Sequence, residues 1–260
     1  MNKKQRENIP ILILMGIIAI FFLSFVDSET NFIKKNKDSN SFEDALDRQL
    51  SSDALHLKLQ EGATRKATPE EIEMAMELPG DGLHYQFLVL TESVETSTEE
   101  LDEILEGKGI LEGQGGAFME AQSRYGVNAL YLISHAQLET GNGRSQLSQG
   151  QELEGERYYN FFGIGAFDFE AVEAGTSYAV RAGWNEPEKA ILGGADFIKN
   201  NYLDKGQKTL YAMRWNPESP GDHLYASDIE WASKIGNIMK GHYRQLDLEG
   251  HNFIQDYYDE

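Results

Sequence analysis

The sequence contains no cysteine, and it is poor in basic residues. The absence of cysteine excludes disulfides, thiolate metal sites, a cysteine nucleophile and a lipid-modified cysteine. Lys and Arg together number 23 against 43 Asp and Glu, which gives a formal net charge of -20. A chain this acidic is a poor nucleic-acid binder, because phosphate contacts require Lys and Arg. We therefore expect no nucleic-acid partner.

One long apolar segment stands near the start of an otherwise ordinary globular composition. Residues 9–26 carry no charge, and only Pro10, Gly16 and Ser24 interrupt the apolar run. About 20 apolar residues are needed to cross a bilayer core of about 30 Å. Three basic residues precede the run and acidic residues follow it, so the positive-inside bias predicts a cytoplasmic N-terminus and an extracellular remainder. The alternative is a cleaved signal peptide, but the run is long for one and lacks an A-x-A site.

The rest of the chain divides by composition. We expect a cytoplasmic tip and transmembrane signal anchor over residues 1–26, and an extracellular, partly helical linker over 27–66. A main domain follows over 67–246, and a C-terminal tail over 247–260. The expected location is the cell membrane, with a single pass and the main domain outside.

Short signals predict several elements of the main domain. Thr68 and Ser97 each begin a capping box, so helices should start there and run to about residues 77 and 106. Residues 85–91 are apolar and rich in aromatics, which favours a strand or an extended segment. A pair of adjacent glycines, at positions 193 and 194 inside a predicted helix, indicates close helix packing.

A carboxylic acid ends the most apolar helix of the domain. Gly126 suits the end of one helix, and Asn128 can cap the next, which should run to Thr140. Glu139 is the last charged residue of that helix and precedes a glycine-rich turn. Partial burial would raise its pKa, so it could stay protonated and donate to a leaving glycosidic oxygen. From this helix alone, a surface Glu that ends a helix is the simpler interpretation.

The segment 158–168 packs five aromatic residues around two glycines. Aromatic faces and amide groups on closely approaching backbone suit sugar rings, whose CH faces are apolar and whose edges are polar. The alternative is a core β-hairpin. Both can hold, because alternate residues of a strand point to opposite faces.

A family resemblance rests on four segments in this order: LISHAQLETGNGRSQL, YYNFFGIGAFD, GWNEPEKAILGGADFI and YASDIEWASKIGNIM. Together they resemble the endo-β-N-acetylglucosaminidase family of bacterial autolysins, glycoside hydrolase family 73, over about residues 85–244. With its single predicted anchor, the chain is most similar to the membrane-bound staphylococcal glucosaminidases of the SagB type.

The resemblance implies a mainly α (α+β) fold: a lysozyme-like helical domain with a small β-lobe, preceded here by one N-terminal transmembrane helix. It implies hydrolysis of the β-1,4 bond between N-acetylglucosamine and N-acetylmuramic acid in peptidoglycan glycan strands. The expected partners are these strands and the lipid bilayer, through residues 9–26. The transmembrane helix could also pair with an integral membrane protein. No cofactor is implied.

The resemblance also assigns residues. Glu139 matches the family's catalytic glutamate, and Tyr225 and Asp228 match its Tyr-Ala-Thr-Asp motif. Two positions depart from that pattern: Ser227 replaces the usual Thr, and Leu224 stands where Gln is frequent. The expected substrate contacts are Asn160, Phe162, Gly163, Asp168 and Trp184.

The second catalytic group stays open at this point. A general base or a nucleophile could come from Asp168, Glu170, Glu173 or Asp228. Asp228 could equally be only a helix cap. The substrate's own N-acetyl group, oriented by Tyr225, is our preferred alternative.

Two other functions compete with this one. A lytic transglycosylase also needs a single catalytic Glu, and a non-catalytic glycan-binding scaffold needs none. A metal site is disfavoured: His135 and Glu139 have the i, i+4 spacing that zinc sites use, but the chain has no HExxH motif. We therefore expect His135 to pack in the helix or to support a residue of the site.

Overall fold

The computed structural model describes residues 41–60, 63–80, 82, 84–145, 147–153, 155–165 and 171–259. They fall into two units. In the smaller unit, Ser41 forms a β-bridge with Asp259, and the ring of Phe42 meets Tyr258 edge-on at 5.5 Å. The larger unit runs from Leu46 to Asp256. The anchor predicted over 9–26 lies outside the described residues, and none of the described helices has the length and apolarity to cross a membrane.

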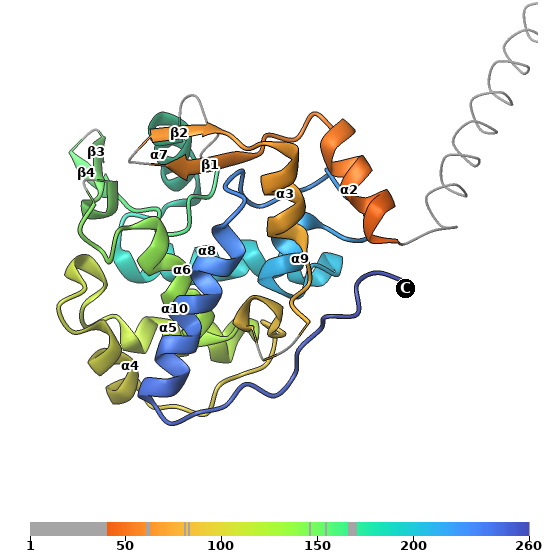
Figure 1. The fold of residues 1–260 in the computed structure, drawn as a ribbon. Helices are drawn as coiled ribbons and strands as arrows, with labels where there is room; N and C mark the ends of the chain where they lie inside the picture. Colours follow the sequence, from red (N-terminus) through yellow and green to blue (C-terminus); the bar gives the residue numbers. More distant parts are fainter. Residues whose placement is uncertain are drawn as a thin grey trace, which may run out of the picture. The chain divides into compact units, whose positions relative to one another are not determined.

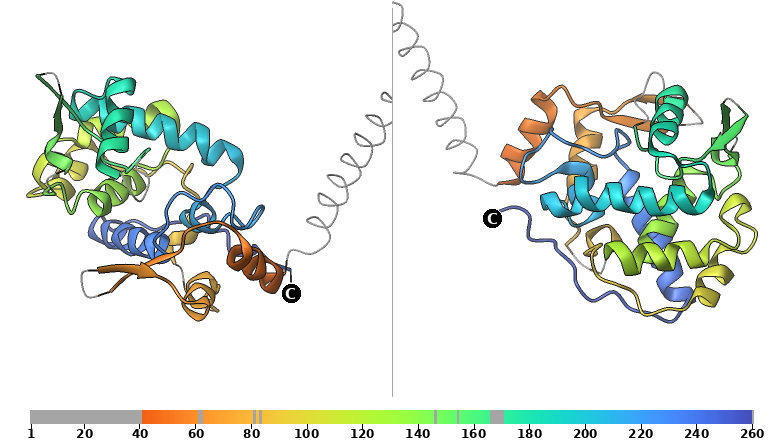
Figure 2. Two further views of the ribbon diagram at one scale, coloured as in Figure 1. Left: turned by 90° about the horizontal axis from the view of Figure 1, so that it is seen from above. Right: turned by 180° about the vertical axis from the view of Figure 1, so that it is seen from behind.

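The larger unit is mainly helical, with two short antiparallel hairpins (Figures 1 and 2). The described α-helices are α2 (Phe42–Ser51, which begins in the smaller unit), α3 (Pro69–Met76), α4 (Thr98–Leu105), α5 (Gly115–Tyr125), α6 (Ala129–Glu139), α7 (Ala171–Ala182), α8 (Pro187–Asn201), α9 (Leu210–Trp215) and α10 (Trp231–Gln245). The hairpins pair β1 (Leu57–Gln60) with β2 (Ala63–Lys66), and β3 (Gln151–Leu153) with β4 (Glu156–Tyr158). Short 3₁₀ turns lie at Tyr85–Phe87, Gly109–Leu111, Leu147–Gln149 and Leu203–Lys205.

Both predicted capping boxes are present. The hydroxyl of Thr68 accepts a hydrogen bond from the backbone N–H of Glu71, whose carboxylate accepts one in return from the N–H of Thr68. Ser97 and Glu100 make the same reciprocal pair at the start of α4. Each cap satisfies backbone donors that the first helical turn leaves free, and contributes about 0.5–2 kcal/mol.

Helix α6 forms the centre of the core and packs against α10 (Figure 1). The left-handed backbone of Gly126 ends α5 at φ 64°, as predicted. Asn128 then caps α6 by accepting a hydrogen bond from the N–H of Tyr131 at 2.9 Å. Every residue from 129 to 137 is buried. Because the helix is buried over this length, it fixes the position of its last residue, Glu139, at the edge of the core.

The strand predicted over residues 85–91 is wrong at its start, because Tyr85–Phe87 form a 3₁₀ turn. The chain extends only afterwards and pairs with the C-terminal tail. The N–H of Val89 donates to the carbonyl of Asn252 at 2.8 Å, and the N–H of Ile254 donates to that of Phe87 at 3.0 Å. The tail thus pairs with this segment through an isolated antiparallel β-bridge between Leu88 and Phe253, which no local pattern could show.

The linker expected over 27–66 contains folded structure in its described part. Part of it was expected to be helical, and α2 is that helix. Residues 57–60 and 63–66, however, pair as β1 and β2. The backbone of Leu57 bonds to the carbonyl of Ser227 and the N–H of Ile229, both at 2.9 Å. This strand therefore fixes the segment that carries Asp228.

The aromatic segment after residue 158 is not the hairpin that alternation allowed. The described hairpin lies just before it, over 151–158, and residues 159–165 are irregular. Gly163 and Gly165 have φ of 67° and 74°, which breaks the extended backbone a strand needs. The glycine pair of α8 does allow close packing, but against side chains of irregular segments and not against a helix: a Cβ at Gly193 would overlap Trp184, and one at Gly194 would overlap Phe162.

Candidate active site

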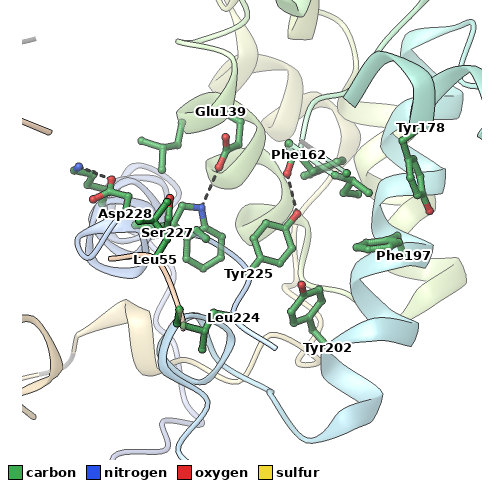
Figure 3. Close-up of a pocket in the computed structure, with 18 of the residues that line it drawn as sticks. Leu55, Glu139, Phe162, Tyr178, Phe197, Tyr202, Leu224, Tyr225, Ser227 and Asp228 are labelled. Carbon is green, nitrogen blue, oxygen red and sulfur yellow. Dashed lines mark hydrogen bonds and ion pairs between the residues drawn. The ribbon is translucent and has the colours of Figure 1, made fainter. Parts of the chain in front are cut away.

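A cavity of about 1120 Å³ lies in the larger unit (Figure 3). Glu139 points into it from the end of α6, and the loop 162–165 forms the wall beside this carboxylate. Aromatic residues of α7 and α8 line one end, and leucines close the other. The lining includes Leu55, Leu59, Tyr178, Arg181, Phe197, Tyr202, Leu224, Tyr225, Asp228, Trp231 and Lys234.

The carboxyl group of Glu139 is held on one side and open on the other. Its side chain keeps 30% of its surface exposed. The indole N–H of Trp231 donates a hydrogen bond to Oε1 at 3.0 Å, and Nε2 of the buried His135 lies 3.6 Å from the same oxygen. Oε2 faces Gly163, where a Cβ would come within 3.3 Å of it. The glycine therefore leaves this oxygen accessible from the pocket.

The turn after Glu139 ends α6 abruptly. Gly141, Asn142 and Gly143 have φ of 56°, 59° and 70°, and three left-handed residues in succession cannot continue a right-handed helix. The hydroxyl of Thr140 accepts a hydrogen bond from the N–H of Gly143 at 2.7 Å. This local geometry makes Glu139 the last helical residue.

A cluster of aromatic side chains lies next to the Glu139 side chain. The ring of Tyr225 stacks on Trp231 at 4.9 Å and 22°. His135 meets Trp231 and Phe162 edge-on, at 5.1 and 5.3 Å. The hydroxyl of Tyr225 donates to the carbonyl oxygen of Phe162 at 2.8 Å. Burial raises the pKa of Tyr225 well above its ordinary value, so this hydroxyl stays neutral.

Asp228 lines the pocket with both carboxylate oxygens engaged. Oδ1 accepts from the backbone N–H of Glu230 at 3.0 Å, and Oδ2 pairs with the ammonium group of Lys234 at 2.7 Å. Lys234 also pairs with Glu230 at 3.2 Å. Asp228 is not the N-cap of α10 that the alternative predicted: the N-cap is Glu230, without a side-chain capping bond, and Asp228 stabilises the turn before the helix.

A buried arginine holds the backbone beside Asp228. Arg214 has no exposed surface and donates to the carbonyls of Asp228 and Ser227 at 2.8 and 3.0 Å. It also donates to Nδ1 of His56 at 3.0 Å, so His56 must be neutral, with its proton on Nε2 near the carbonyl of Gln49. Burial, together with the arginine charge, lowers the pKa of His56 to about 4.

The predicted substrate contacts separate into two groups. Phe162 and Gly163 line the pocket. Asn160 instead holds its own loop, donating to the carbonyl of Ile164 at 2.7 Å and accepting from its N–H at 3.1 Å. Trp184 is buried in the core and packs on Tyr178 at 5.3 Å. Neither of these two is among the pocket-lining residues.

Three candidates for the second catalytic group cannot be placed. Asp168, Glu170 and the side chain of Glu173 lie outside the described part of the structure.

The predicted packing role of His135 is confirmed, since the residue is fully buried among aromatic rings. Within the described residues, no group of three or more His, Cys, Asp or Glu side chains could hold a metal ion. Sequence reasoning did not single out Trp231 or Arg214. The one local signal was that Trp231 follows Asp228 by three residues, and nothing in that spacing reveals its contact with Glu139.

Residues 115–244 match the family model for mannosyl-glycoprotein endo-beta-N-acetylglucosaminidase. This chain belongs to the glucosaminidase family, and it is a glycoside hydrolase. The Bifunctional autolysin of Staphylococcus epidermidis is 49% identical over 179 residues, which are 66% of this chain and 13% of the autolysin. The glucosaminidase described here thus spans only about an eighth of that relative's length.

Two crystal structures of Autolysin E from S. aureus share the fold. One, in complex with the muropeptide NAM-L-Ala-D-iGlu, is 46% identical, with a TM-score of 0.78 over 84% of this chain and 97% of that one. The other, a catalytic mutant in which alanine replaces a glutamate, holds the disaccharide NAG-NAM. It is 45% identical, with the same TM-score and coverage. The mixed helical, lysozyme-like fold with small β-sheets is therefore confirmed for this glucosaminidase.

Proposed function

We propose that this glucosaminidase hydrolyses the β-1,4 bond between N-acetylglucosamine and N-acetylmuramic acid in peptidoglycan strands, with Glu139 as general acid. The observation that carries the proposal is the placement of the Glu139 carboxyl group, which ends a buried helix inside the pocket with one oxygen held and one accessible. Autolysin E supports the substrate, since its structures hold a muropeptide and a NAG-NAM disaccharide. Its catalytic glutamate mutant supports a glutamate as the essential group.

The described pocket offers little support for a second catalytic carboxylate. Among its described lining residues, the carboxylates are those of Glu139 and Asp228. Both oxygens of Asp228 are already occupied, one of them by an ammonium group, which weakens it as a base or nucleophile. The engagement of Asp228 therefore supports attack by the substrate's own N-acetyl oxygen over a role for this carboxylate.

Tyr225 is suited to orient that acetamide. Its only hydroxyl proton is donated to the carbonyl of Phe162, so the lone pairs of its oxygen remain to accept from the acetamide N–H. In the first step, the acetamide oxygen forms a bond to C1 as the C1–O bond breaks and the leaving oxygen takes the proton of Glu139. Water then attacks C1, the oxazolinium ring opens, and the Glu139 carboxylate accepts the proton released by the water.

We also propose that residues 9–26 anchor the chain in the cell membrane, as in the SagB-type enzymes, with the catalytic domain outside. The uncharged length of this run and the basic residues before it support the proposal. The enzyme would then cut strands near the membrane, where they are newly made. Cells that carry only a released domain should show a changed distribution of glycan-strand lengths. An unchanged distribution would refute this placement.

The catalytic proposal is tested by analysing the products of purified wall digested with the wild type and with Glu139→Gln. We expect reducing N-acetylglucosamine ends from the wild type and none from the variant, with both proteins equally folded by circular dichroism. Anhydromuramic ends would identify a lytic transglycosylase. Glycan binding by the wild type without any cleavage would identify a scaffold.

A further inference from the structure

The contact between Trp231 and Glu139 joins the first residue of α10 to the last residue of α6. Trp231 is 3% exposed, and its indole N–H can only donate. With the nitrogen 3.0 Å from Oε1, that oxygen must be an acceptor toward the indole. Figure 3 marks this bond by the dashed line that ends at the Glu139 carboxyl group.

Neighbouring residues fix the orientation of the Trp231 indole, and so fix the direction in which its N–H points. Tyr225 stacks against its face at 4.9 Å, and His135 closes its edge at 5.1 Å. Its backbone N–H donates to the carbonyl of Asp228 at 3.1 Å. The ring therefore cannot turn away from Glu139 without disturbing the pocket wall.

His135 approaches the same oxygen without bonding to it. Its Nε2 lies 3.6 Å from Oε1, beyond hydrogen-bond distance, and this nitrogen is buried with no other partner among the described residues. Its Nδ1 faces the hydroxyl of Tyr131 at 3.2 Å. Both neighbours therefore crowd Oε1, and Trp231 supplies its only directional bond in the described structure.

We propose that Trp231 is a positioning residue that determines which oxygen of Glu139 delivers the proton. Because Oε1 is committed to the indole N–H, the neutral acid carries its proton on Oε2, the oxygen that faces Gly163 and the open pocket. Trp231 also fixes the carboxyl plane, so that Oε2 meets the leaving oxygen in one orientation. This inference rests on the proposed function of Glu139 as general acid.

The test compares two replacements that remove the N–H donor. Trp231→Phe deletes the donor and part of the ring. Incorporation of β-(3-benzothienyl)alanine at position 231 replaces the N–H by sulfur and preserves the ring shape. For both we expect kcat to fall about 10- to 100-fold, the cost of a misdirected reacting group, with KM nearly unchanged.

Trp215→Phe is the matched control. It removes an indole that is 1% exposed and whose N–H has no partner among the described residues, outside the pocket lining. We expect it to lower stability without changing kcat or KM. A wild-type kcat for the benzothienyl variant would overturn the proposal. An active Glu139→Gln variant would instead refute the proposed function itself, so the two failures are distinguishable.

Discussion

The hydroxyl of Tyr225 donates a hydrogen bond of 2.8 Å to the backbone carbonyl oxygen of Phe162, 63 residues earlier in the chain. The bond links two pocket-lining residues and joins the segment before α10 to the glycine-containing loop beside Glu139. It also fixes the hydrogen-bonding role of Tyr225. While the bond is kept, the hydroxyl oxygen can only accept a hydrogen bond from a bound ligand. Tyr225 therefore shapes the pocket and offers the substrate an acceptor.

Tyr225→Phe removes that acceptor and the bond to the carbonyl of Phe162. We expect kcat to fall about 10- to 100-fold, because the acetamide loses the group that orients it. Stability should fall by about 0.5–1.5 kcal/mol, the net contribution of one hydrogen bond. Release of reducing ends from purified wall and denaturant unfolding measure the two effects. If kcat is unchanged while stability falls, the hydroxyl serves the fold alone.

Gly163→Ala tests the space beside Oε2 of Glu139. The residue has φ of 67°, so alanine should cost about 1–2 kcal/mol of backbone strain. Its methyl group would also lie 3.3 Å from Oε2. We expect kcat/KM to fall at least tenfold, because the accessible side of the acid becomes crowded, an order-of-magnitude effect for a small misplacement.

Gly183→Ala is the control for that strain. Gly183 has φ of 71°, and an added Cβ would meet no atom within 4 Å. It should lose about the same 1–2 kcal/mol, measured by thermal unfolding, and keep full activity. Equal losses of activity in the two variants would show that strain, and not proximity to Glu139, limits the reaction.

The buried His56 predicts a loss of stability in mild acid. Its pKa is lowered from 6.5 to about 4 by burial and by the Arg214 charge, so the unfolded chain binds the proton more readily than the folded one. The contribution of His56 to the free energy of unfolding is therefore fully present above about pH 6.5. It is lost as the pH falls toward 4, by about 3 kcal/mol in total. Denaturant unfolding at a series of pH values between 4 and 7 measures this slope.

His56→Gln should flatten that slope, because the amide oxygen can still accept from Arg214 but does not titrate. His242, whose pKa burial also lowers to about 4, stays in the variant. About half of the slope should therefore remain, since two comparable groups contribute. A slope identical to that of the wild type would mean that His56 does not titrate differently in the folded and unfolded states.

Local signals predicted the helix boundaries of this protein well, because their partners lie close in sequence. The capping pairs Thr68–Glu71 and Ser97–Glu100 are each three residues apart, and Asn128 caps an N–H three residues on. Glu139 was found for the same reason: its helix, its cap and its glycine turn form one continuous stretch. These contacts form whatever the rest of the chain does.

The contacts that organise the site are of another kind. Trp231 reaches Glu139 across 92 residues, and Arg214 reaches His56 across 158. No pattern in the sequence orients these side chains toward one another, since tertiary packing alone decides it. The same limit explains Asn160 and Trp184, whose residue types suit sugar binding but which the packing directs into a loop and into the core.

Asp228→Asn separates a structural role from a catalytic one. The amide oxygen can keep the bond to the N–H of Glu230, while the ion pair with Lys234 is lost. A partly exposed pair of this kind contributes about 0–1 kcal/mol, so the free energy of unfolding should change little. We expect kcat to fall less than about tenfold, because both oxygens of Asp228 already serve the start of α10.

Glu230→Gln is the matched control, since it removes the other ion-pair partner of Lys234 from a residue outside the pocket lining. If Asp228 acts only through Lys234 and the helix start, the two variants should lose similar small amounts of stability and activity. A loss of about a thousandfold in Asp228→Asn alone would show instead that this carboxylate takes part in the chemistry, as base or nucleophile. Such a result would replace the substrate-assisted step with one in which Asp228 is freed from Lys234 when the glycan binds.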